Sequence, residues 1–295
     1  MVCTYYLQDV LHSKSSAIDI ETVLSAVNES WHSLLVASLL IPVNWGIEAL
    51  KWKFILSNTI GISFKSAYRS VLSGVTFGIV TPNGIGDYGG RAISLPSNKR
   101  AQGLFLNGFL SLTQLLITVV IGLLGFSIVQ FIFEVAIPLI LLYGACMVLL
   151  VGFMRVKLKF VFLKRALNLK GISTPVVLKD RLKVLFLSAI RYLVFSIQFV
   201  LLLETLHAGL SLLNYFALIA TTYLAVAIIP TGWFSNLLVR GSIAFYLFEQ
   251  FAGLGEVAVL ASSLLWLINL FVPAMAGLFC IGRIDWMLLL KFRVS

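Results

Sequence analysis

The apolar residues of this chain fall into long continuous runs rather than into the spaced stripes of a soluble amphipathic helix. A helix needs about 20 predominantly apolar residues to cross the hydrocarbon core of a bilayer. Six runs approach or exceed that length, and they cover residues 34–56, 104–129, 135–153, 184–206, 212–229 and 257–281. The pattern therefore predicts an all-α polytopic membrane protein.

Two segments, 66–96 and 212–252, carry Pro and Gly at their centres. The first has the sequence TPNGIG at 81–86 and the second has PTG at 230–232. Proline and glycine at such a position end one helix and allow another to begin. We interpret both segments as re-entrant helical hairpins beside about five full spans. The legs of the second are also long enough to cross fully, so that alternative stays open.

Composition supports a membrane location and argues against conventional enzyme chemistry. The chain is 60% hydrophobic and 12% charged, with a mean hydropathy of +1.01. Its three cysteines and three histidines show no metal-ligand spacing, and nucleotide-binding or hydrolase motifs are missing. We expect no enzyme activity, cofactor, metal or nucleic-acid partner. We also expect no cleaved signal peptide, since 1–30 lacks an apolar stretch ending in a small-residue cleavage site.

Basic residues predict the orientation, because loops rich in Lys and Arg stay in the cytoplasm. The segment 155–183 is the most basic of the chain, and of the 22 Lys and Arg residues only Lys14 falls in a predicted outside segment. This places 155–183 and the C-terminus in the cytoplasm of a bacterial inner membrane and 1–30 outside.

The two halves of the chain share an order of elements: a span, a hairpin with a Pro-x-Gly apex, and a span. Pro82 precedes Arg91 by nine residues, and Pro230 precedes Arg240 by ten. The hairpins enter from opposite sides, which predicts an inverted repeat of about 34–130 and 184–283. Such repeats with broken helices are typical of secondary transporters.

The breaks supply the candidate site. The helix that follows each break presents free N–H groups, which favour an anion, and arginine can grip phosphate through two parallel hydrogen bonds. We predict that Arg91 and Arg240 bind an anionic headgroup and that Asp87 orients Arg91. Alternatively, Asp87 and Arg91 only neutralise each other across one helical turn. The remaining candidates at the breaks are Asn83, Gly84, Gly232 and Asn236.

Three further polar residues in the spans are secondary candidates. Glu48 lies three residues before Lys51, so a local ion pair near the interface is an alternative to a proton or substrate role. Arg191 lies two turns inside its span and could snorkel to the cytoplasm. Gln114 is interpreted first as a residue that hydrogen-bonds between helices.

The residues NWGIEALKWK at 44–53, FKSA at 64–67 and TPNGIGDYGGR at 81–91 resemble the lysylphosphatidylglycerol synthase transmembrane (flippase-like) family. Members show a basic-Trp pair that closes an early span, then a Pro…Gly-Glu/Asp…Arg motif. A second Pro-Gly break is matched only loosely by 230–240. The resemblance covers about 18–283, without the soluble aminoacyl-transferase domain and without the usual N-terminal span.

The resemblance implies lipid translocation. We therefore expect an amphipathic segment at 1–33, a flippase-like domain at 34–283 and a cytoplasmic tail at 284–295. The expected substrate is a lipid with an anionic phosphate-bearing headgroup, of the phospholipid or polyprenyl-phosphate type. The alternatives are a secondary transporter of a small anion, a membrane transferase with a lipid donor, and an accessory subunit. The oligomeric state is left open, a homo-oligomer included.

Overall fold

The computed structural model describes residues 28–57, 60–132, 176–206, 208–229 and 233–281, together with positions 25, 143, 144 and 147. Throughout these ranges the regular structure is helical, and none of the described residues lies in a strand. The prediction of an all-α protein is confirmed for this part of the chain. Apart from positions 143, 144 and 147, the predicted run 135–153 and the basic segment up to 175 lie outside the described residues.

Among the described residues, four helical stretches are long and apolar enough to cross a membrane. They are α3 (Trp31–Leu56), Ser97–Ile132, which combines the short η2 (Ser97–Lys99) with α6 (Arg100–Ile132), α9 (Leu178–Thr205), and Gly255–Ile281. The last stretch consists of α12 (Gly255–Trp266), the π-helical turn η3 (Leu267–Phe271) and α13 (Val272–Ile281).

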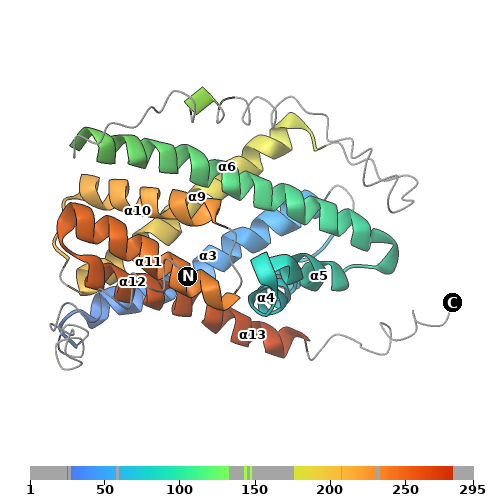
Figure 1. The fold of residues 1–295 in the computed structure, drawn as a ribbon. Coiled ribbons are helices and arrows are strands. Elements are labelled where there is room, and N and C mark those ends of the chain that lie inside the picture. The colour runs from blue at the N-terminus through green and yellow to red at the C-terminus, as the bar shows by residue number, and fades with distance from the viewer. Residues whose placement is uncertain are drawn as a thin grey trace.

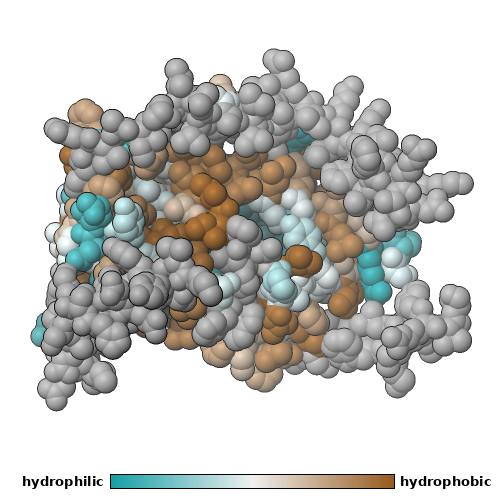
Figure 2. All heavy atoms as spheres, in the orientation of Figure 1, coloured by the Kyte–Doolittle hydropathy of each residue, from teal (hydrophilic) through white to brown (hydrophobic). Residues whose placement is uncertain are grey.

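The outer surface of these helices is strongly apolar. Large apolar side chains are exposed on all four stretches, among them Phe131 at 87%, Phe186 at 66% and Phe279 at 81%. Figure 2 shows that hydrophobic residues dominate the described part of one face, while hydrophilic residues lie in a recess near its centre. Apolar surface on this scale is unusual for a soluble monomer, and lipid is its natural solvent. The helices therefore indicate a membrane protein.

The first predicted hairpin is a pair of helices joined by a sharp break. Helix α4 (Phe64–Ile79) ends just before the 3-10 turn η1 (Pro82–Gly84), and α5 (Ile85–Ile93) follows at once. Pro82 opens the turn, where its missing N–H costs nothing, and Gly84 adopts a φ of 66°. Thr81 Oγ1 accepts a hydrogen bond from Gly86 N at 2.7 Å, which ties the break to the start of α5.

Close backbone contact holds α4 against α5. A Cβ atom at Gly74 would collide with the side chains of Asp87 and Arg91, and one at Gly90 would lie 2.7 Å from the Ser73 carbonyl. The glycines thus let the polar side of α5 lie directly on α4. That the pair enters and leaves the membrane on one side stays a prediction.

The second predicted hairpin comprises α10 (Leu212–Ile228) and α11 (Trp233–Ala252). Its predicted apex at 230–232 lies outside the described residues. Helix α10 has 17 residues, fewer than the roughly 20 that a perpendicular span requires. Whether α10 and α11 re-enter or cross therefore stays open.

Helices of the two halves pack in an exchanged arrangement, which Figure 1 shows. Helix α3 of the first half packs along α9 of the second. Helix α4 packs against α13, and α10 packs against α6. One helix of each predicted hairpin therefore contacts the last candidate span of the other half. A two-fold relation between the halves would give this pairing. The repeat itself stays a prediction.

Candidate functional site

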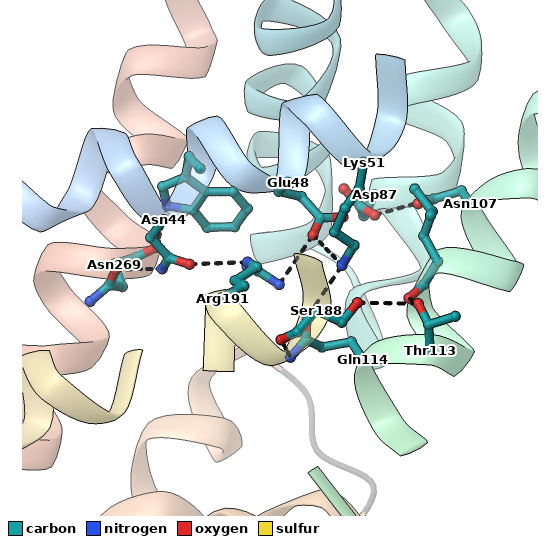
Figure 3. A network of polar contacts seen from close by, with 12 residues as sticks. Asn44, Glu48, Lys51, Asp87, Asn107, Thr113, Gln114, Ser188, Arg191 and Asn269 are labelled. Atoms are coloured by element: carbon teal, nitrogen blue, oxygen red, sulfur yellow. Dashed lines mark hydrogen bonds and ion pairs between the residues drawn. The ribbon is translucent and has the colours of Figure 1, made fainter. Parts of the chain in front are cut away.

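A single buried carboxylate, that of Glu48, contacts three cationic side chains from three helices. Glu48 on α3 accepts a hydrogen bond from Lys51 Nζ at 2.9 Å through Oε2 and from Arg91 Nη1 at 2.9 Å through Oε1. The Nη1 atom of Arg191 on α9 lies 3.4 Å from Glu48 Oε2. The Glu48 side chain is only 6% exposed. Figure 3 shows this carboxylate among the labelled residues around it. The predicted Glu48–Lys51 pair is therefore present, but it is buried and is part of a larger network.

Asp87 is the second carboxylate of the site, and it forms an ion pair with Arg91. Arg91 Nε donates to Asp87 Oδ1 at 2.9 Å, and Asn107 Nδ2 on α6 donates to Asp87 Oδ2 at 2.9 Å. The Arg91 guanidinium also lies 5.8 Å from the ring centroid of Trp52. Arg91 thus contacts two carboxylates, Asp87 and Glu48, which fix its orientation and offset its charge.

Arg191 points into the helix bundle, so the interpretation that it snorkels to the cytoplasm is wrong. Its Nε donates to Asn44 Oδ1 at 3.0 Å, and its guanidinium lies 5.0 Å from the ring centroid of Trp45. Asn44 Nδ2 in turn donates to Asn269 Oδ1 at 2.9 Å (Figure 3). Asn44 accepts a hydrogen bond from Arg191 and Glu48 offers it an opposite charge, and both lie on α3, which explains why the side chain turns toward that helix.

Gln114 links three helices through its amide. Its Oε1 accepts from Lys51 Nζ at 3.3 Å, and its Nε2 donates to the Ser188 carbonyl at 3.3 Å. These contacts join α6 to α3 and α9. The interpretation of Gln114 as an interhelical hydrogen-bonding residue is therefore correct.

The network forms one wall of a cavity of about 640 Å³. The predicted site residues described by the structure line this cavity: Arg91, Arg240, Asp87, Gly84, Asn236, Glu48, Arg191 and Gln114. For Asn83 only the backbone is described, and Gly232 lies outside the described residues. The structure thus brings together residues from both predicted hairpins.

Arg240 differs from the other arginines of the cavity. Its Nε is buried and makes no hydrogen bond to any described residue. Its guanidinium lies 5.9 Å from the ring centroid of Phe195. A ring face attracts a cation but does not accept all the hydrogen bonds that a guanidinium offers. Within the described part of the chain, the Nε–H group of Arg240 therefore lacks a hydrogen-bond acceptor.

A second cavity of about 250 Å³ adjoins the first. Aromatic residues Tyr192, Phe195 and Tyr223 form part of its lining. Four residues line both cavities, namely Gln114, Thr118, Arg191 and Arg240. Arg191 and Arg240 therefore lie at the border between the two spaces.

The charged side chains that line the cavity are three arginines and two carboxylates. Among the described residues no group of three or more His, Cys, Asp or Glu side chains could hold a metal ion. Both carboxylates of the cavity already accept hydrogen bonds from arginine. The arginines therefore present cationic hydrogen-bond donors to the cavity.

Asn44 is a network residue that was not among the candidates predicted from the sequence. The spacing of Asn44, Glu48 and Lys51 could have identified it, because residues separated by three or four positions share a helix face. Three polar residues on one face of an apolar span indicate an inward-facing polar stripe.

No family model, no curated protein sequence and no solved structure matches this chain.

Proposed function

We propose that the protein translocates a membrane lipid whose anionic, phosphate-bearing headgroup occupies the 640 Å³ cavity. One observation carries the proposal. Arg240 places a buried guanidinium Nε, which has no hydrogen-bond partner among the described residues, in the same cavity as Arg91 and Arg191. A charged group inside a membrane protein is costly unless it has a partner, so a site of this kind selects an anion.

The chemistry of arginine favours phosphate among anions. Its planar fork donates two parallel hydrogen bonds to phosphate oxygens. Burial strengthens such charge-assisted bonds, since the local dielectric constant is low. The start of α5 at Gly84 and the first part of α11 at Asn236 also line the cavity, and helix N-termini favour anions.

The remaining cavity wall suits a lipid. Leu110, Leu115 and Leu270 line the same space as the charged residues, and the outer surface of the helices is apolar. A headgroup could therefore pass along a polar path while its acyl or prenyl chains stay in the hydrocarbon. In this proposal 66–96 and 212–252 are re-entrant hairpins of an inverted repeat, and the C-terminus is cytoplasmic. The resemblance to the flippase-like family points to the same function.

A flipping assay tests the proposal. The purified protein is placed in liposomes that contain phosphatidic acid labelled on one acyl chain with a dithionite-sensitive dye. Wild-type protein should bring dye from the inner leaflet within reach of external dithionite. Arg240→Gln should reduce the rate at least tenfold, because loss of a charge-assisted hydrogen bond costs about 1.5–3 kcal/mol.

Arg69→Gln is the matched control, since Arg69 is an exposed residue of α4 that lines neither cavity. It should flip lipid at the wild-type rate. A folded wild-type protein without flipping activity refutes the proposal. Uptake of radiolabelled phosphate by the same liposomes, without flipping, would support a small-anion transporter instead.

A further inference from the structure

The charges of the described residues in and beside the cavities do not balance. Glu48 and Asp87 contribute two negative charges, and both contact Arg91. Lys51, Arg91, Arg191 and Arg240 contribute four positive charges. Among these described residues, two positive charges remain without a carboxylate of their own.

Geometry shows which cations hold this excess. Arg91 lies 2.9 Å from each of two carboxylates, and Lys51 lies 2.9 Å from Glu48. Arg191 has the longest ion contact of the network, 3.4 Å to Glu48, and its side chain is 20% exposed. Arg240 Nε has no described hydrogen-bond partner. The excess therefore belongs to Arg191 and Arg240.

These two arginines are also the charged residues that line both cavities. They extend from different helices, α9 and α11. A ligand group at the border of the two spaces can therefore be approached by both guanidinium groups, with Gln114 and Thr118 as neighbouring polar groups.

We propose that the site is specific for a doubly charged phosphate group, of the phosphomonoester class, held between Arg191 and Arg240. The inference rests on the proposed function and narrows its substrate. A phosphodiester carries one negative charge and would offset only half of the excess. A terminal phosphomonoester carries close to two at neutral pH, since its second pKa is about 6. Lipids with a terminal phosphate and free inorganic phosphate share this chemistry.

Equilibrium binding tests the inference independently of transport. Wild-type protein in detergent is titrated at pH 8 with phosphatidic acid and with its methyl ester, phosphatidylmethanol. The methyl ester is a phosphodiester that has the same acyl chains and one negative charge fewer. Native mass spectrometry counts the bound lipid. We expect phosphatidic acid to bind about tenfold more tightly, as one further charge-assisted contact to arginine implies. Competition with inorganic phosphate at the same pH distinguishes the sources. Displacement of the lipid by millimolar phosphate would show that the free anion suffices, whereas no displacement would show that the lipid chains are required.

Two variants locate the preference. Arg191→Gln and Arg240→Gln should each bring the two affinities to within about threefold of each other, whereas Arg69→Gln should keep the wild-type ratio. Arg240→Gln removes no described hydrogen bond of Nε, so its fold should be retained, and circular dichroism checks this. Equal affinity of wild-type protein for both lipids overturns the inference and leaves lipid flipping standing. Strong preference without flipping overturns the proposed transport and leaves the binding site standing.

Discussion

Replacing Glu48 by Gln should destabilise the folded protein more than any other single change of charge in the network. The substitution keeps the shape of the side chain and removes the negative charge that faces Lys51, Arg91 and Arg191 at 2.9, 2.9 and 3.4 Å. Breaking a buried ion pair by removing one partner costs about 3–5 kcal/mol.

The remaining partners of the three cations determine where in that range the loss of unfolding free energy falls. Arg91 keeps Asp87, Arg191 keeps Asn44 Oδ1, and Lys51 keeps Gln114 Oε1 at 3.3 Å. Each cation therefore retains one acceptor, although only Asp87 is charged. We expect a loss of about 3 kcal/mol of unfolding free energy, the lower end of the range for buried pairs.

Equilibrium unfolding in mixed detergent micelles measures this loss. The double variant Glu48→Gln, Lys51→Met should recover part of it, because it removes one of the cations left without a carboxylate. Glu256→Gln is the control. Glu256 lies in the first turn of α12, where its interaction with the helix dipole contributes less than about 1 kcal/mol. Wild-type stability of Glu48→Gln would refute the conclusion that this carboxylate offsets the charge of the three cations.

Two further predictions concern packing and topology. Gly74→Ala should destabilise the protein by about 1–3 kcal/mol, because the new Cβ would collide with side chains of α5. Gly46→Ala should be neutral or stabilising, since its Cβ would lie 4.0 Å from the nearest atom, and thermal unfolding compares the two. In a variant without the three native cysteines, a cysteine at Ser16 should react with an impermeant maleimide in intact cells, and one at Ser173 should react only after lysis. Labelling of Ser173 in intact cells would contradict the predicted orientation.

The helical fold could be predicted because its determinants are local in the sequence. The run 104–129 lies within the helical stretch Ser97–Ile132, since length and apolar composition are sufficient to recognise such a helix. The break between α4 and α5 could also be predicted, because Pro82 and Gly84 act through their own backbone geometry. Both signals are independent of what packs against them.

The direction of Arg191 could not be predicted for the opposite reason. Its position two turns inside a span is compatible with a side chain that reaches the membrane surface. Rotation of α9 about its axis decides between the surface and the interior, and tertiary packing sets that rotation. The decisive acceptor, Asn44, lies 147 residues earlier in the chain. No local pattern connects the two residues.

Arg91 and Arg240 occupy corresponding places in the predicted repeat, yet their surroundings differ. Asp87 precedes Arg91 by one helical turn and pairs with it, whereas the position one turn before Arg240 holds Asn236, which has no charge. If the two arginines had only a structural role, the second would need a carboxylate as the first does, because an unpaired buried charge is costly. The first arginine can therefore hold α5 in place, while the second keeps its charge for a ligand. Because of this difference, we expect Arg240 to contribute mainly to ligand binding and Arg91 mainly to the stability of the fold.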